Sequence, residues 1–172
     1  MTPAQQAAAQ AIIDGPRGAL YGPFVPLLRS PELMDHVQRL GEYLRYRSAL
    51  GTRLSELAIL ITARHWDQQV EWAIHAPVAA QAGISEEMIG DIAHARRPSS
   101  MSDEEAAVYD FSRELNRNKG VSDQAYAKAL ALFGERGVVD LMAINGYYTL
   151  LAMVMNAAQT AAPGSPLPRR TA

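Results

Sequence analysis

The sequence predicts an all-α protein, and three observations support this fold class. Apolar residues recur at three- and four-residue spacings along most of the chain, as they do on the buried faces of helices. No segment alternates apolar and polar residues over the length of a strand. Several segments begin with a serine or threonine that can cap a helix and end at a glycine. The chain of 172 residues suffices for one domain with a buried core, expected at 1–162, and a Pro-rich tail at 163–172.

The N-terminal segments predict two helices joined by a loop. Residues 3–13 are rich in Ala and Gln, and Thr2 can cap the helix that they form. Residues 17–28 contain glycines and prolines among apolar residues, so we expect a structured loop that packs on the body. Ser30 can cap a second helix with Pro31 at its first position. The apolar stripe expected to be buried on this helix consists of Leu33, Val37, Leu40 and Leu44.

Two apolar helices are expected in the middle of the chain. Residues 53–64 are apolar on nearly all sides, which predicts a central, buried helix. A polar interruption follows at 64–69, and a second apolar helix should cover 70–83 and end at its glycine. Pro77 should kink this second helix or split it just after His75, because proline cannot donate the helical hydrogen bond.

Four further helices are expected at residues 85–95, from Ser102 onward, at 122–133 and at 137–158. Ser102 and Glu105 form a capping-box pattern, and Gly134 should end the helix before it. The last helix is long and apolar enough to span a bilayer. It contains Asp140 and lacks a strong basic flank, so we expect a buried helix of a soluble assembly. It carries more apolar surface than one small domain covers, which favours a homo-oligomer.

Composition excludes several classes of function. The formal net charge is -2 and the few basic pairs form no dense patch, so neither a nucleic-acid nor a membrane partner is expected. The chain has no cysteine, which excludes disulfides, thiolate catalysis and thiolate metal sites. The first residues lack the basic and apolar regions of a secretory signal, so a cytoplasmic location is expected.

Three ionisable side chains fall on the two most apolar helices, namely Glu56, Glu71 and His75. Glu71 and His75 are four residues apart, so they share one helix face. An unpaired buried charge is costly, which indicates that these groups are paired. Burial raises the pKa of a carboxyl group, and a neighbouring carboxylate favours a protonated imidazole. Such a cluster could therefore act as an acid–base device near neutral pH.

Other interpretations of these polar residues remain open from the residues alone. A histidine on an apolar helix is more often a hydrogen-bonded core residue than a catalyst, and spacing alone favours that structural interpretation. Glu and His can also bind metals, but these helices contain no HExxH motif, so no metal is expected. Arg47 and Arg53 could bind a substrate carboxylate, although solvent exposure is their more common fate. Tyr147 and Tyr148 are expected in the core or at an interface, with their hydroxyls satisfied.

The core block at 53–95 contains the pattern SELAILITARHWDQQVEWAIHAPVAAQAGISEEMIGDI. This pattern resembles the carboxymuconolactone decarboxylase family, which includes the alkylhydroperoxidase D-like (AhpD-like) proteins. The redox branch of that family has a glutamate, a C-x-x-C pair twelve and fifteen residues later, and a histidine four residues after the second cysteine. Counted from Glu56, these positions are Gln68, Glu71 and His75. Both cysteines are therefore replaced, and VEWAIH resembles the cysteine-free, decarboxylase-like branch.

The resemblance covers residues 17–168, since RGALYGPFVPLLRSPEL, INGYYTLLAMVMNA and a late PLP look like flanking blocks of the same family. It implies an orthogonal helical bundle of the AhpD-like type with about seven or eight helices. Family members form symmetric oligomers, which implies a homotrimer or a homohexamer. Thiol peroxidase chemistry needs a thiolate to attack the peroxide, so the redox activity does not carry over to this chain.

The resemblance also implies a cofactor-independent lyase that acts on a small carboxylated lactone or related organic acid, as in aromatic-compound degradation. In this interpretation His75 donates a proton or binds the enolate, Glu71 orients it or shares the proton, and Glu56 polarises the pair. No cofactor is expected. The candidate substrate-binding residues are Gln68, Tyr21 and His65. The alternatives are a non-catalytic helical oligomer that binds a small ligand, and a metal-assisted or non-thiol peroxidase-related enzyme on the same site.

Overall fold

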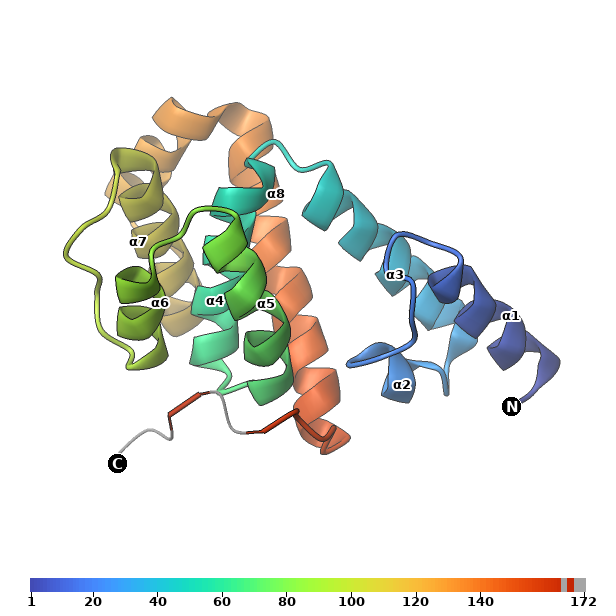
Figure 1. The fold of residues 1–172 in the computed structure, drawn as a ribbon. Helices are drawn as coiled ribbons and strands as arrows, with labels where there is room; N and C mark the ends of the chain where they lie inside the picture. The colour runs from blue at the N-terminus through green and yellow to red at the C-terminus, as the bar shows by residue number, and fades with distance from the viewer. Residues whose placement is uncertain (165–166, 169–172) are drawn as a thin grey trace.

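The computed structural model describes residues 1–164 and 167–168 (Figure 1). Within these residues the chain forms eight helices and no strand, which confirms the predicted all-α class. The helices are α1 (Pro3–Ile13), α2 (Phe24–Leu27), α3 (Pro31–Tyr46), α4 (Gly51–His65), α5 (Gln69–Gln81), α6 (Glu86–Ala93), α7 (Asp103–Asn118) and α8 (Asp123–Ala157). Part of the expected Pro-rich tail, 165–166 and 169–172, lies outside the described residues.

Helix α4 is the centre of the bundle, as its apolar sequence predicts. It packs most extensively against α5, α7 and α8, and every residue in 54–64 is buried. Figure 1 shows α4 among these neighbouring helices. Since α4 has no solvent-facing stripe, the polar groups that it carries need partners inside the bundle.

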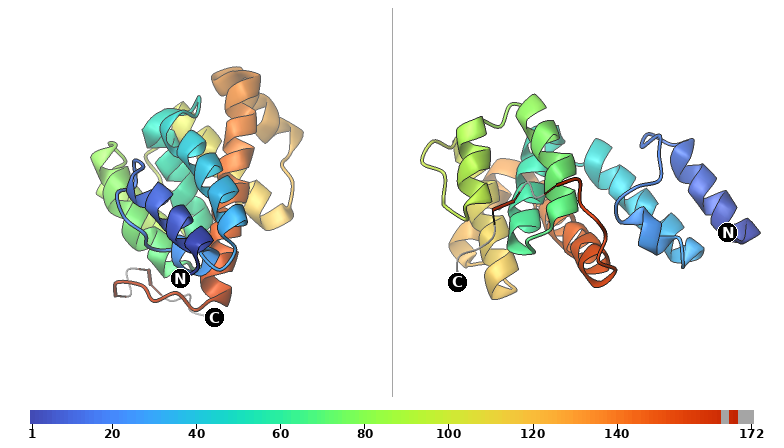
Figure 2. Two further views of the ribbon diagram at one scale, coloured as in Figure 1. Left: turned by 90° about the vertical axis from the view of Figure 1, so that its right-hand side faces the viewer. Right: turned by 60° about the horizontal axis from the view of Figure 1, so that its bottom comes forward.

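Helices α1, α2 and α3 form an N-terminal layer beside this body. Both α1 and α2 pack on α3, and α3 contacts α4 and α8. Figure 2 shows this N-terminal layer extending to one side of the bundle. The segment expected to be a loop contains the short helix α2, whose Phe24 and Leu27 are buried. Because α2 contacts both α3 and α8, it lies at the junction between the layer and the body.

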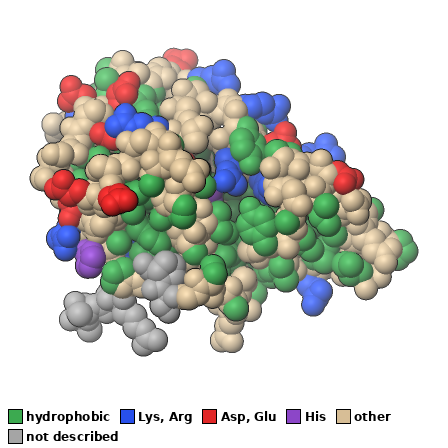
Figure 3. All heavy atoms as spheres, viewed as in Figure 1, with side chains coloured by type: hydrophobic (Ala, Val, Ile, Leu, Met, Phe, Trp, Pro, Cys, Tyr) green, Lys and Arg blue, Asp and Glu red, His purple; other side chains and the backbone are tan. Residues whose placement is uncertain are grey.

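The buried face of α3 differs from the expected stripe. Val37 and Leu44 are buried as predicted, but Leu33 and Leu40 are 48% and 45% exposed. Met34, which the pattern did not select, is fully buried. The helix is packed on one side only, so rotation about its axis decides which apolar residues are covered. Figure 3 shows hydrophobic side chains across the surface of the N-terminal layer.

The predicted helix caps are formed at two positions and absent at a third. Thr2 opens α1 and Ser102 opens α7, each with a reciprocal capping box. Ser30 precedes α3 but makes no capping hydrogen bond with its side chain. Each box satisfies two backbone N–H groups that have no acceptor within the helix, which fixes where α1 and α7 begin.

Proline does not interrupt α5. The helix runs from Gln69 to Gln81 with Pro77 inside it, so the expectation of a split after His75 was wrong. The loss of one backbone hydrogen bond is tolerated in a helix that packs on α4 and α6. Because the helix is continuous, Glu71 and His75 remain one turn apart on the same side.

Helix α8 contains one break, at Gly134, where φ is 66° and ψ is 177°. A positive φ of this kind suits glycine, which has no Cβ atom to clash with the backbone. The break separates the two helices expected at 122–133 and 137–158, and Figure 1 shows the resulting bend in α8.

Among the described residues, α8 is the one helix long and apolar enough to cross a membrane. However, 56% of its most apolar window is buried within the protein. Its Asp140 accepts hydrogen bonds from the Tyr43 hydroxyl at 3.0 Å and from the Ala49 N–H at 2.7 Å. These contacts are typical of a core helix in a helical bundle, in which buried polar groups are satisfied internally.

Candidate functional site

A buried pair joins the two apolar helices at the centre of the candidate site. Glu56 on α4 and His75 on α5 are both buried, and Glu56 Oε2 lies 2.7 Å from His75 Nδ1. The other carboxylate oxygen, Oε1, lies 3.9 Å from Arg45 Nε. Glu56 is thus held between an imidazole and a guanidinium. Because Nδ1 of His75 is engaged by Glu56, Nε2 is the ring nitrogen that remains for a substrate.

Glu71 lies on the same helix as His75 but does not bond to it. Its side chain is buried, and neither carboxyl oxygen has a hydrogen-bond partner among the described residues. Burial raises the pKa of Glu71 well above its usual value, because removal from water penalises the charged form. Spacing suggested a pair within α5, whereas the structure pairs His75 with Glu56 across two helices. Glu71 is therefore placed to hold a proton.

Two tyrosines of α8 complete the buried side of the site. The rings of Tyr148 and His75 meet edge to face with 5.1 Å between centroids, and Tyr147 packs on Tyr148 at 5.2 Å. The Tyr147 hydroxyl has no hydrogen-bond partner among the described residues, although the sequence predicts satisfied tyrosine hydroxyls. Burial raises the pKa of Tyr147 to about 12, so this hydroxyl remains a neutral hydrogen-bond donor.

A glycine on α3 makes room for the Tyr147 hydroxyl. A Cβ atom at Gly41 would overlap with Tyr147 Oη and would lie 2.8 Å from Arg17 Nη2. Any other residue at this position would therefore displace one of these groups. Gly41 thus allows a hydroxyl donor and a guanidinium to approach each other next to Glu71.

These groups surround a small cavity of about 30 Å³ between the N-terminal layer and the body. It is lined by Arg17, Tyr21, Pro23, Phe24, Arg45, Glu71, Ile74, His75, Tyr147, Tyr148 and Leu151. Glu56 lies behind His75, as their hydrogen bond requires. A cavity of this volume holds about one water molecule, so in this conformation it is too small for an organic substrate. Figure 3 shows basic side chains at the boundary between the layer and the body.

The structure brings one of the three expected substrate-binding residues to this small cavity. Tyr21 lines it and is 36% exposed. Gln68 instead caps α5 by accepting a hydrogen bond from the Val70 N–H at 2.7 Å, and its amide donates to Asn156 at 2.7 Å. His65, at the end of α4, lines a different and larger cavity.

The arginines that line the small cavity are not among the residues predicted from the sequence. Arg17 precedes α2 and Arg45 is near the end of α3, whereas the sequence pointed to Arg47 and Arg53. Each of those two pairs with a glutamate and lies outside this cavity. Arg17 has a sequence signal, since it opens the flanking block RGALYGPF. Arg45 has no such sequence signal, because only the packing of α3 decides which arginine of this helix faces inward.

The arrangement resembles a set of proton-holding groups more than a set of metal ligands. Among the residues that the structure describes, no group of three or more His, Asp or Glu side chains is placed to hold a metal ion. Glu56 and His75 bond to each other, and Glu71 bonds to neither. The buried pair of Glu56 and His75 is chemically suited to stabilise negative charge. The separate protonated acid, Glu71, is suited to deliver a proton.

Comparisons with known proteins agree with this fold. A family model described as the carboxymuconolactone decarboxylase family matches residues 31–114, a span that includes Glu56, Glu71 and His75. A crystal structure of a protein of unknown function from Agrobacterium tumefaciens, with a suggested AhpD-type role in antioxidant defence, superposes with a TM-score of 0.72. The two chains are 18% identical, and the match covers 80% of this chain and 95% of the other. This likeness confirms the predicted AhpD-like bundle. No curated protein matches the sequence significantly.

Proposed function

We propose that this chain, which belongs to the carboxymuconolactone decarboxylase family, is a cofactor-independent lyase that decarboxylates a small carboxylated lactone or a related organic acid. One observation carries the proposal. A buried carboxyl group, Glu71, has no hydrogen-bond partner among the residues that the structure describes, and burial favours its protonated form. It lies in the same cavity as His75 and two arginines. This combination provides an anion-binding group, an oriented imidazole and a proton source.

The arginines suit the binding of an acidic substrate. Arg17 and Arg45 both line the small cavity, and a guanidinium can bind a carboxylate through two parallel hydrogen bonds. Arg45 is already near Glu56, with 3.9 Å between Nε and Oε1, so part of its charge is offset. Arg17, whose Nη2 lies near the position of Tyr147 Oη, is the better candidate for the lactone or carboxylate oxygen.

The chemical step needs no electron acceptor outside the substrate. The bond between the ring and its carboxylate breaks, carbon dioxide leaves, and the bonding electrons remain in the ring as an extended enolate. In this scheme the Tyr147 hydroxyl donates a hydrogen bond to the enolate oxygen. The imidazolium form of His75, which has a proton on each ring nitrogen, donates a second hydrogen bond from Nε2. Glu71 then transfers its proton to carbon, and it recovers a proton from water after the product leaves.

Glu56 is a positioning residue in this scheme. Its hydrogen bond to Nδ1, at 2.7 Å, fixes the orientation of the His75 ring, and its carboxylate attracts the positive charge of the imidazolium form. The ring is also held from the side by the edge of Tyr148. Both contacts come from other helices, so the imidazole is fixed before the substrate binds.

Substrate entry requires the segment before α2 to move. This segment contributes Tyr21 and Arg17 to the cavity, and it contains Gly18 and Gly22, both at positive φ. Glycines at these positions give the backbone freedom that other residues lack. Movement of this loop would enlarge a cavity of about 30 Å³ enough to admit a small organic acid and then exclude water from it.

We also propose that the protein acts as a cytoplasmic homo-oligomer, either a trimer or a hexamer. Val139, Met142, Leu150 and Met153 follow one face of α8 and are 37–58% exposed. Exposed apolar stripes of this kind mark protein contact surfaces. Static light scattering at micromolar concentration should give the mass of three or six chains, and a monomer would contradict this assembly.

The catalytic proposal is tested with carboxymuconolactone and other acidic intermediates of aromatic-compound degradation, by following the release of carbon dioxide. His75→Ala and Glu71→Gln should each lower kcat/KM by about 10²–10⁴-fold, the usual contribution of a general acid or base. His36→Ala is the matched control, because His36 is exposed on α3 and lines neither cavity. Unchanged turnover in both site variants would overturn the assignment.

A further inference from the structure

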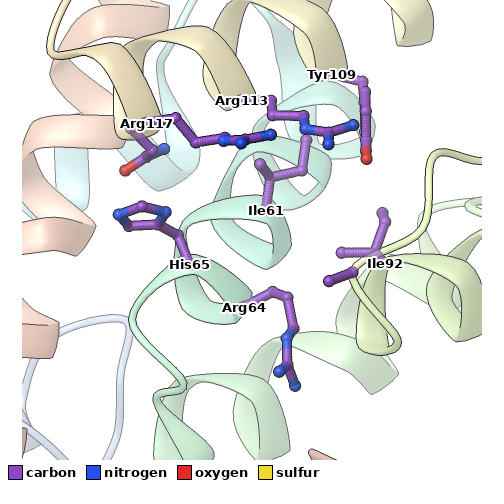
Figure 4. A pocket seen from close by; sticks show the side chains of 9 residues that line it. Ile61, Arg64, His65, Ile92, Tyr109, Arg113 and Arg117 are labelled. Atoms are coloured by element: carbon purple, nitrogen blue, oxygen red, sulfur yellow. The ribbon is translucent and has the colours of Figure 1, made fainter. Parts of the chain in front are cut away.

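A second cavity lies between α4, α6 and α7, where His65 is found (Figure 4). Its volume is about 540 Å³, which is within the range of small-molecule binding sites. It shares no lining residue with the small cavity, and the proposed decarboxylation does not use it. We call it the basic cavity, after the arginine and histidine side chains that line it.

All charged side chains that line the basic cavity are cationic or can become so. They are Arg64, His65, Arg113 and Arg117, and no acidic residue of the described chain is among the lining residues. Arg113 and Arg117 are four residues apart on α7, where like charges repel each other. Neither forms an ion pair with any residue that the structure describes. An anion placed between them would remove this repulsion.

The orientation of the basic side chains separates them into two groups. Figure 4 shows Arg113 and Arg117 extending from α7 over Ile61, on the side where the His65 ring lies, while the Arg64 guanidinium points away. Arg64 donates to the Pro168 carbonyl at 2.7 Å and also bonds to an aspartate. Arg113 and Arg117 are thus the two arginines whose guanidinium groups lie at the cavity.

The nearby acids are engaged elsewhere. Asp110, one turn before Glu114 on α7, pairs with Arg97 at 2.9 Å. Glu114 accepts a hydrogen bond from the Ser122 N–H at 2.6 Å. Neither lines the basic cavity, so the protein itself does not neutralise Arg113 and Arg117. Their charge is available to a molecule from solution.

The rest of the cavity wall is apolar. Ile61, Ile92, Ala95 and the ring of Tyr109 line it, and Ile92 and Tyr109 are buried. The Arg113 guanidinium lies 6.0 Å from the centre of the Tyr109 ring, a cation–π contact that restrains the arginine. One side of the cavity therefore suits a negative group, and the other suits a flat or branched hydrocarbon body.

We propose that the basic cavity binds a small amphipathic anion, a carboxylate or phosphate attached to an apolar body such as an aromatic ring. Arg113 and Arg117 bind the anionic group through charge-assisted hydrogen bonds. Ile61, Ile92 and Tyr109 cover the hydrocarbon part and exclude water from it. This binding is independent of the Glu56, Glu71 and His75 site and of any reaction that takes place there.

The test measures binding rather than turnover, so its result is separate from that of the catalytic proposal. Benzoate, phenyl phosphate and inorganic phosphate are titrated into the full chain by calorimetry or by amide chemical shifts. Benzoate and phenyl phosphate should bind saturably, and the Arg113→Gln/Arg117→Gln variant should weaken both by about tenfold or more. Inorganic phosphate should bind more weakly than phenyl phosphate, because it lacks the apolar body.

Two control variants locate the binding. Arg29→Gln/Arg39→Gln removes two exposed arginines that line neither cavity, and it should leave the affinities unchanged, as should His75→Ala. The proposal is overturned if none of the aryl anions saturates, if His75→Ala abolishes their binding, or if inorganic phosphate binds as tightly as phenyl phosphate. It is also overturned if light scattering shows that Arg113→Gln/Arg117→Gln dissociates an oligomer, since the cavity would then contact a second copy of the chain.

Discussion

The small cavity and the basic cavity differ in size, in burial and in the ionisable side chains that line them. The small cavity has a volume of about 30 Å³ and contains the buried acid Glu71 together with Arg17 and Arg45. The basic cavity has a volume of about 540 Å³ and is lined by basic side chains without an acidic one among the described residues. Both lie next to α4, which supplies Glu56 behind one and His65 to the other.

The difference shows how burial controls protonation. Glu71 is buried in the small cavity, so hydration does not offset the free-energy cost of charging it and its pKa rises. In the basic cavity Arg117 is exposed to solvent, so its positive charge is hydrated and has no large desolvation cost. The first environment is suited to moving a proton, and the second is suited to binding a fixed negative charge.

The largest expected effect on stability comes from Glu71→Gln and depends on pH. The folded protein holds a proton on Glu71 that the unfolded chain releases above its usual pKa of 4.5. The wild type should therefore lose stability as pH rises from there through the raised pKa, by about 1.4 kcal/mol per pH unit. Glutamine cannot ionise, so Glu71→Gln should match the wild type at low pH and exceed its stability at higher pH. Urea unfolding between pH 4 and pH 8 measures this difference.

Glu87→Gln is the control for that series, since Glu87 is exposed on α6. Its stability relative to the wild type should not change with pH in this way. A constant difference between Glu71→Gln and the wild type across this pH range would show that Glu71 is solvated.

The second effect comes from filling the space beside Tyr147. Gly41→Ala should destabilise the protein by about 1–3 kcal/mol, because the added methyl overlaps with the Tyr147 hydroxyl and overpacking outweighs the gain in helix propensity. Gly146→Ala on α8 is the matched control, since a Cβ atom there meets nothing within 4 Å. It should stabilise by up to about 1 kcal/mol. Thermal unfolding distinguishes the two, and equal shifts would contradict the close packing at Gly41.

A smaller change in stability is expected from Tyr147→Phe. Within the described part of the chain the hydroxyl has no hydrogen-bond partner, so its removal should alter the free energy of unfolding by less than about 1 kcal/mol. If it binds the enolate, however, kcat should fall by about 10²-fold, as for other donors of this kind. Tyr126→Phe serves as the control, because Tyr126 is 42% exposed. A large loss of stability without a loss of kcat would assign Tyr147 to packing alone.

The smallest change in stability is expected from substitutions in the basic cavity. Arg113→Gln/Arg117→Gln should change stability by less than about 0.5 kcal/mol, with a slight gain at low salt from the loss of like-charge repulsion on α7. Chemical denaturation at two salt concentrations is sufficient to measure it. A destabilisation above about 1 kcal/mol would mean that these arginines stabilise the fold. That result would contradict a role in ligand binding alone.

Local sequence signals predicted most of the helices and half of the candidate site. The capping box at Ser102, the break at Gly134 and the apolar character of α4 all depend on neighbouring residues along the chain, so the pattern is sufficient to find them. The spacing along the chain is likewise sufficient to identify Glu56, Glu71 and His75 as candidate residues. Signals of this kind did not reveal which face of α3 is buried, because α3 is packed from one side only.

The sequence by itself determined that the protein is helical, where its main helices begin and end, and that no thiol chemistry is available. The tertiary structure decided that His75 pairs with Glu56 and not with Glu71, that Arg17 and Arg45 line the small cavity, and that His65 lines the basic cavity. The physical reason is that helix periodicity fixes only which residues share a face. The partners, burial and pKa of those residues are set by whatever distant helix packs against that face.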